Sequence, residues 1–179
     1  MNDTGHEFIA RSRYHLAKDF LPKIERCLEQ LTDEQIWWRP NEQSNSIGNL
    51  ILHLCGNARQ WIVSGLGGAA DARDRTAEFA QREMIPGASL HSLLQRTLND
   101  VDFTLEQCDT SKLLDRQTIQ GTDVTALAAI FHVVEHFSMH TGQIILLTKL
   151  MTATDLRFYD FEDRKPVLRV SSSSETSKA

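Results

Sequence analysis

The sequence predicts an all-α protein, an antiparallel four-helix bundle with a long connection between the second and third helices. Apolar residues recur at three- and four-residue steps over most of the chain, and no segment alternates convincingly between apolar and polar residues. Four prolines and nine glycines among 179 residues also leave room for long uninterrupted helices. An up-down-up-down order is the simplest arrangement, but a connection that crosses the bundle stays open.

The first helix is expected over about residues 4–30. Its apolar stripe consists of Ile9, Leu16, Phe20, Ile24, Cys27 and Leu31. Pro22 lies inside this pattern and predicts a kink or a break, because proline donates no backbone hydrogen bond and crowds the preceding turn. Residues 32–35 then have the spacing of a capping box, which predicts a short helical turn before Trp37.

Ser46 is expected to cap a second helix that ends near Ser64, ahead of a glycine-rich stretch. The apolar face of this helix carries Ile47, Leu50, Leu54, Ala58 and Trp61. Residues 65–88 form the long connection to the third helix, and a short helix is expected within residues 75–81.

The third helix is expected to begin with Ser89 as its cap. Its apolar stripe consists of Leu90, Leu94, Thr97, Val101, Leu105 and Cys108. After a loop, the fourth helix is expected over about residues 123–151. The chain ends in small polar residues, which we expect to be disordered from residue 171 onward. These elements predict one domain at residues 1–160, followed by a polar tail at residues 161–179.

Composition and charge argue against several classes of protein. The formal net charge of −5 does not fit a nucleic-acid-binding surface, because such a surface needs clustered cations. No apolar run approaches the roughly 20 residues that span a bilayer, and the N-terminal residues lack an apolar signal core. Three cysteines (Cys27, Cys55 and Cys108) are too few for a disulfide framework and read as reduced thiols. We therefore expect a cytoplasmic protein with no nucleic-acid or membrane partner.

Histidine is the unusual component, since three of the seven histidines fall within nine residues of the expected fourth helix. The apolar face of that helix is defined by Ala126, Ala129, Val133, Phe137, Ile144, Leu147 and Met151. Helical spacing places His136 and His140 within this face, one turn apart, where a bundle ordinarily has leucine. His132 and Gln143 lie at its edge, and Glu135 points to solvent.

A metal ion would explain this pair of histidines. A buried imidazole without a partner costs on the order of 1–3 kcal/mol, and a divalent ion satisfies two imidazoles at i and i+4 together. His53, at the edge of the second helix's apolar face, offers a third nitrogen. We therefore predict His53, His136 and His140 as metal ligands, with coordination positions left open for water or substrate. The candidates that hold the ligand rings in place are Asn57, His132 and Gln143.

Other interpretations of the histidines stay open. A histidine on an apolar face is more often a hydrogen-bonded core residue than a ligand, and the three could form a buried network without metal. Glu135 is next to His136 but on the solvent side, so no general base is evident and no catalytic residue is assigned. The sequence also lacks a phosphate-binding glycine loop, a G-x-S-x-G nucleophile motif and a C-x-x-C pair.

Two stretches resemble the DinB-like (YfiT-like) superfamily: NSIGNLILHLCGNARQW in the second helix, and HVVEHFSMHTGQI in the fourth. The segment LTDEQIWWRP is similar to an uncharacterised subgroup, and the resemblance covers about residues 5–155. It implies a four-helix bundle in which three histidines hold a divalent metal, commonly zinc or nickel. By motif position these ligands are His53, His136 and His140.

The resemblance also implies possible functions. One is a metal-dependent thiol S-transferase or hydrolase that acts on a small molecule, such as a low-molecular-weight thiol. A cation lowers the pKa of a bound thiol or water, so the two reactions share the same site. Residues 65–88 and 37–39 would then shape the substrate side. The alternative is a non-enzymatic bundle with a structural metal, or with a dimerisation or stress-related binding role. Many members of the superfamily are dimers, so a homodimer is expected.

Overall fold

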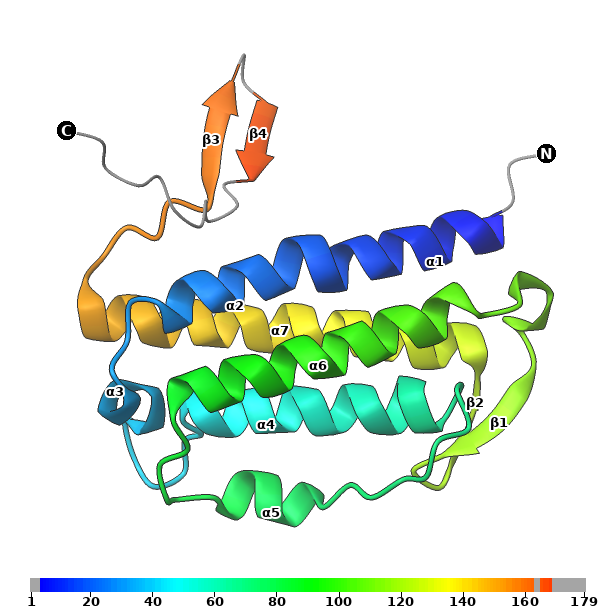
Figure 1. The fold of residues 1–179 in the computed structure, drawn as a ribbon, viewed down its shortest axis with the longest axis horizontal. Helices are drawn as coiled ribbons and strands as arrows, with labels where there is room; N and C mark the ends of the chain where they lie inside the picture. Colours follow the sequence, from blue (N-terminus) through cyan, green and yellow to red (C-terminus); the bar gives the residue numbers. More distant parts are fainter. Residues whose placement is uncertain (1–3, 163–164, 169–179) are drawn as a thin grey trace.

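The computed structural model describes residues 4–162 and 165–168, which are mainly helical. The long helical segments are α1 (Thr4–Tyr14) with η1 (His15–Phe20) and α2 (Leu21–Leu28), α4 (Ile47–Ala58) with η2 (Arg59–Ser64), α6 (Gly87–Glu106) and α7 (Ala126–Thr152). Figure 1 shows these segments lying side by side. The predicted helical class is therefore confirmed. Within the described part of the chain, no helix is long and apolar enough to cross a bilayer.

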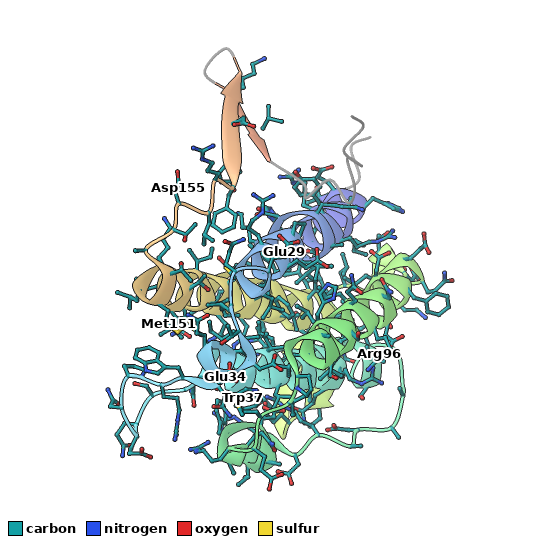
Figure 2. All side chains as sticks on the ribbon, turned by 60° about the vertical axis from the view of Figure 1, so that its left-hand side comes forward. Glu29, Glu34, Trp37, Arg96, Met151 and Asp155 are labelled. Carbon is teal, nitrogen blue, oxygen red and sulfur yellow. The ribbon has the colours of Figure 1, made fainter. Side chains whose placement is uncertain are left out.

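The core lies between these segments, each of which contributes side chains with no exposed surface. Examples are Ile24 of α2, Leu54 of α4, Leu94 of α6 and Phe137 of α7. Complete burial of such a side chain contributes about 1.5–3 kcal/mol relative to exposure. Side chains fill the space between the helices when the molecule is viewed from the end at which Glu34 and Trp37 lie (Figure 2).

The order of the helices differs from the simplest prediction, because α4 and α6 run in the same direction. The start of α6 lies beside α3 (Asp33–Trp37), where the Gly87 N–H donates to Asp33 Oδ1 at 2.7 Å. The other end of α6 lies beside the end of η2, where Thr104 contacts Gly67. The connection that holds α5 (Arg75–Ala80) therefore runs back along α4 (Figure 1). The up-down-up-down order is wrong, and the crossing connection is the one observed.

Helix starts follow the predicted capping residues in two cases out of three. Thr32 and Ser46 cap α3 and α4, each in a complete capping box. The prediction that Ser89 caps the third helix is wrong, because α6 begins at Gly87 and the Ser89 N–H donates to the Pro86 carbonyl at 2.8 Å. No side chain of α6 itself caps the helix, and the Gly87 N–H at its start donates instead to Asp33 Oδ1 of α3.

At Pro22, where a kink or a break is predicted, the first helical segment continues without a break. The six residues of η1 before α2 form a π-helix, in which the Leu21 N–H donates to the Leu16 carbonyl. The wider turn accommodates a residue that cannot donate a hydrogen bond and whose ring would crowd an α-helical turn. The long helix therefore continues through a local widening.

Two hairpins were not predicted from the sequence. Strands β1 (Arg116–Ile119) and β2 (Thr122–Thr125) pair through a turn at Gln120 and Gly121, whose φ angles are 52° and 74°. The expected loop and the expected start of the fourth helix at residue 123 are therefore wrong here, and α7 begins at Ala126. Four-residue strands are too short to give a visible alternation.

The second hairpin joins β3 (Tyr159–Glu162) to β4 (Lys165–Leu168). It begins just before the expected domain boundary at residue 160. The expected disordered residues 171–179 lie outside the described part of the chain.

Candidate metal centre

Three histidines from two neighbouring helices come together. His53 lies on α4, and His136 and His140 lie one turn apart on α7. Each ring offers one nitrogen, and these three nitrogens all lie within 4.8 Å of one another. Nε2 of His53 is 2.8 Å from Nε2 of His136. The structure thus brings together the residues that the sequence predicts as ligands. The group could hold a metal ion.

Burial lowers the pKa of two of these imidazoles, His136 and His140. His53 is 5% exposed and His140 is 8% exposed, and His136 is half-buried. Burial, with the neighbouring His140 and His53, lowers the pKa of His136 to about 3. Burial also lowers the pKa of His140, although its hydrogen bond to Gln143 opposes the effect. At neutral pH, the rings of His136 and His140 therefore each have a nitrogen lone pair available for a metal.

Hydrogen bonds at the far side of two rings show which nitrogen is free. Nδ1 of His53 lies 2.8 Å from Glu78 Oε2, and Nδ1 of His140 lies 2.7 Å from Gln143 Oε1. Because these oxygens only accept, each Nδ1 carries the proton and donates it. The Nε2 atoms of His53 and His140 then carry the lone pairs, which suits metal coordination.

The three residues expected to hold the ligand rings behave differently. Gln143 contacts the ligand candidate His140 directly. Asn57 is hydrogen-bonded to another of the expected supporting residues, since its Nδ2 donates to Nε2 of His132 at 3.1 Å. The His132 ring in turn lies against His136, with ring centroids 5.4 Å apart. Glu135 is exposed, as its position on the helix predicts.

Two buried polar atoms beside His132 have no hydrogen-bond partner among the described residues, Asn57 Oδ1 and Trp61 Nε1. Trp61 packs on the His132 ring with centroids 4.2 Å apart. An unsatisfied buried polar atom costs about 1–3 kcal/mol. One buried acceptor and one buried donor next to the His132 ring are therefore left unsatisfied.

The connection between η2 and α6 covers His53. The Phe79 ring of α5 lies against the imidazole, with centroids 4.5 Å apart. Trp37 holds the far end of the connection, since its Nε1 donates to the Ile85 carbonyl at 2.9 Å. Phe79 thus places residues 65–88 against the histidines, whereas the role of this connection and of residues 37–39 in shaping a substrate side stays a prediction.

Glu78 and Arg73 of this connection belong to the site, and neither is predicted from the sequence. Glu78 is 8% exposed, and Arg73 donates to it twice, from Nε to Oε1 at 2.7 Å and from Nη2 to Oε2 at 3.0 Å. One signal was available in the sequence. Gly56 lies in the interior of a helix, where glycine is unfavourable unless another group approaches closely. A Cβ at Gly56 would overlap Glu78 Oε1.

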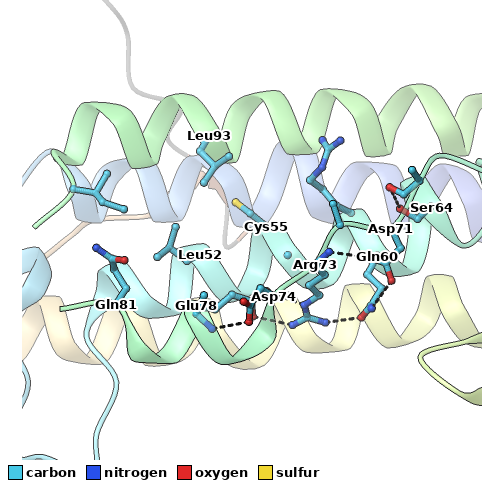
Figure 3. A pocket seen from close by; sticks show the side chains of 16 residues that line it. Leu52, Cys55, Gln60, Ser64, Asp71, Arg73, Asp74, Glu78, Gln81 and Leu93 are labelled. Atoms are coloured by element: carbon cyan, nitrogen blue, oxygen red, sulfur yellow. Dashed lines mark hydrogen bonds and ion pairs between the residues drawn. The ribbon is translucent and has the colours of Figure 1, made fainter. Parts of the chain in front are cut away.

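Glu78 is ionised in this setting. Burial opposes ionisation, but the hydrogen bonds donated by His53 and Arg73 outweigh it, so the pKa of the Glu78 carboxyl lies below its ordinary value. On the other side of Glu78 and Arg73 lies a cavity of about 410 Å³. Figure 3 shows the pair in the wall of this cavity. Apolar residues such as Leu52 and Leu93 also line it.

The family and the fold have known relatives. A family model described as a protein of unknown function (DUF1572) matches residues 3–161. A conserved protein from Enterococcus faecalis, seen in a crystal structure, is 17% identical with a TM-score of 0.64, and the match covers 84% of this chain and 96% of that one. A DinB-like protein, YjoA, from Bacillus subtilis is 20% identical with a TM-score of 0.62, covering 81% and 94%. No curated protein matches the chain.

Proposed function

We propose that this chain, which belongs to the DUF1572 family, binds one divalent metal ion through His53, His136 and His140. The DinB-like resemblance predicted from the sequence is confirmed by the family match and by the structural neighbours. The observation that carries the proposal is the 2.8 Å approach of the Nε2 atoms of His53 and His136.

The residues present fit a metal ion. Two imidazole nitrogens bound to one ion at about 2.1 Å lie roughly 3 Å apart, close to the separation seen here. The lowered pKa values of His136 and His140 keep these two imidazoles uncharged at neutral pH. The Glu78 carboxylate holds the third ring, that of His53, through its Nδ1. Imidazole nitrogens suit zinc and nickel, and we propose one of these.

The scaffold we propose is a four-helix bundle in a single domain at residues 1–160. The first segment and α7 would run opposite to α4 and α6. The side-by-side course of the helices in Figure 1 supports this arrangement. His53 pairs with His136, and Asn57, one turn later on α4, pairs with His132, one turn earlier on α7, so α4 and α7 run in opposite directions.

For the reaction, we propose metal-dependent thiol S-transfer or hydrolysis on a small molecule, such as a low-molecular-weight thiol. The bound ion would lower the pKa of a coordinated thiol or water. Phe79, whose ring lies against His53, would exclude water on that side of the ion. Three nitrogen ligands also leave coordination positions free for that substrate.

A second candidate is a non-enzymatic protein that dimerises and holds a structural metal. Large apolar side chains on the outer face of α7 favour it: Phe131, Met139, Leu146 and Leu150 are each at least half exposed. Apolar surface of this kind marks association sites. Sedimentation gives the mass in solution, and a dimer that Leu150→Glu converts to a monomer supports dimerisation through this face of α7.

Metal binding is tested on protein purified without a histidine tag. Elemental analysis and titration with Zn²⁺ and Ni²⁺ are expected to give one ion per chain. His136→Ala is expected to weaken metal binding by more than about 100-fold. Loss of a residue that only supports a ligand weakens it by about 10- to 100-fold, so the larger effect indicates a ligand. His91→Ala is the matched control, because His91 pairs with Glu25 instead. Wild-type protein that holds and takes up no metal would contradict the proposal.

His140→Ala separates catalysis from structure. Thiol-transfer and ester-hydrolysis assays are run beside thermal unfolding of the metal-loaded protein. Lost turnover with little change in melting temperature supports an enzyme. A large fall in melting temperature, with no turnover by the wild type either, supports a structural metal.

A further inference from the structure

Glu78 is held in place from several directions. Arg73 binds its carboxylate with two hydrogen bonds, and Arg73 Nη1 donates to Gln60 Oε1 at 2.9 Å. Gln60 Nε2 continues the chain to Asp71 Oδ2 at 2.7 Å, as Figure 3 shows. The Glu78 backbone is also fixed, because Asn49 Nδ2 of α4 donates to its carbonyl at 2.9 Å. The carboxylate is thus presented to His53 in one orientation.

The contacts around Nδ1 of His53 depend on that carboxylate. Arg73 Nη2 lies 3.1 Å from this nitrogen, and Glu78 Oε2 lies 2.8 Å from it. Arginine only donates, so Arg73 favours the tautomer of His53 with a bare Nδ1, whereas the Glu78 carboxylate favours the tautomer with a proton on Nδ1. With Glu78 present, both donors point to its oxygen and the proton stays on Nδ1. Without it, Arg73 would donate to Nδ1, and the proton would move to Nε2.

We propose that Glu78, held by Arg73, is a positioning residue that keeps the Nε2 lone pair of His53 available to the metal. This inference rests on the proposed function. A carboxylate that accepts from the outer N–H of a ligating histidine fixes its tautomer and its orientation and raises its basicity. Loss of such a partner weakens metal binding by about 10- to 100-fold.

The first measurement needs no metal. Long-range ¹H–¹⁵N NMR of the metal-free protein reports which ring nitrogen of His53 carries the proton. The wild type is expected to show the Nδ1–H tautomer, and Glu78→Ala the Nε2–H tautomer. A purely structural role of Glu78 would leave the tautomer unchanged. An Nε2–H tautomer in the wild type would overturn the inference.

The second measurement is the affinity for Zn²⁺ by chelator competition, with Co²⁺ absorption as a report on ligand geometry. Glu78→Ala is expected to weaken binding 10- to 100-fold. Glu78→Gln keeps an acceptor and is expected to lose less, and it serves where Glu78→Ala does not fold. Asp74→Asn is the control, because it removes one negative charge from the same segment while asparagine still caps α5.

The outcomes separate the two proposals. Wild-type protein that takes up no metal contradicts the proposed function, and the role of Glu78 at a metal fails with it. Wild-type protein that binds zinc, with both Glu78 variants as tight as Asp74→Asn, overturns the role of Glu78 alone.

Discussion

At Gly56, α4 carries no side chain because the carboxylate of Glu78 occupies that space. A Cβ at this position would overlap Glu78 Oε1 and lie 3.1 Å from Arg73 Nε. The absence of a methyl group at Gly56 thus lets Glu78 of the connection between η2 and α6 reach Nδ1 of His53.

Gly56→Ala is therefore expected to weaken both the fold and the affinity for metal. The added methyl displaces Glu78, whereas alanine in a helix is ordinarily more favourable than glycine by about 0.5–1 kcal/mol. Gly142→Ala is the matched control, because nothing lies within 4 Å of its added Cβ. Thermal unfolding should show Gly142→Ala slightly more stable than the wild type and Gly56→Ala less stable. Equal stabilisation by both would contradict the close packing of Glu78.

The grouping of the three histidines could be predicted from the sequence, whereas the sequence offers only Gly56 as a sign that another group approaches α4 and does not identify that group as Glu78. His136 and His140 stand out because polar residues interrupt an otherwise apolar face at helical spacing. Glu78 is surrounded by other charged residues in a segment that reads as exposed. Its burial results from a contact with a residue 25 positions earlier, which local sequence does not encode.

Between elements, α1 and α6 are joined by a specific ion pair. Arg13 donates to both oxygens of Asp102, at 2.7 Å and 2.9 Å. The side chains are partly exposed, so solvent screens the attraction. The hydrogen bond from Arg13, more than the opposing burial, places the pKa of Asp102 below its ordinary value.

Asp102→Asn is expected to lower the free energy of unfolding by no more than about 1 kcal/mol at neutral pH. Because the folded-state pKa is lowered, the contribution is present while Asp102 is ionised and is lost as the pH falls through that value. Urea unfolding at several pH values and salt concentrations tests this. The difference from the wild type should shrink in acid and at high salt. A difference that is unchanged in acid would show that the charge of Asp102 contributes nothing.

Helices were the predictable elements and the hairpins were not. The helical period extends over many residues in α6 and α7, so it is visible despite single exceptions. The hairpin of β1 and β2 depends on left-handed backbone at Gln120 and Gly121, and glutamine gives little sign of that conformation. The parallel course of α4 and α6 was also not fixed, because a long connection permits either direction.

At the scale of the whole molecule, a bound ion would join parts that are far apart in the chain. It would tie α4 to α7 through the histidines, and Glu78 would extend the link to the connection between η2 and α6. The ion would therefore stabilise the fold as a ligand that binds only the native state.

Metal is accordingly expected to raise the melting temperature. At an ion concentration about 100 times Kd, the free energy of unfolding rises by about 2.7 kcal/mol. For a chain of this size that corresponds to a shift of roughly 5–10 °C. Differential scanning calorimetry with Zn²⁺, before and after a chelator, measures the shift. No shift at saturating ion, or the same shift in His136→Ala, would contradict a site at the histidines.

Anomalous diffraction from crystals of the metal-loaded protein, recorded at the absorption edge of the metal, shows directly whether the three histidines hold the ion. We expect one strong anomalous peak per chain, bonded to ring nitrogens of His53, His136 and His140. An empty position at the three histidines, with His53 and His136 still joined by a direct hydrogen bond, would contradict it and leave a buried histidine network in its place.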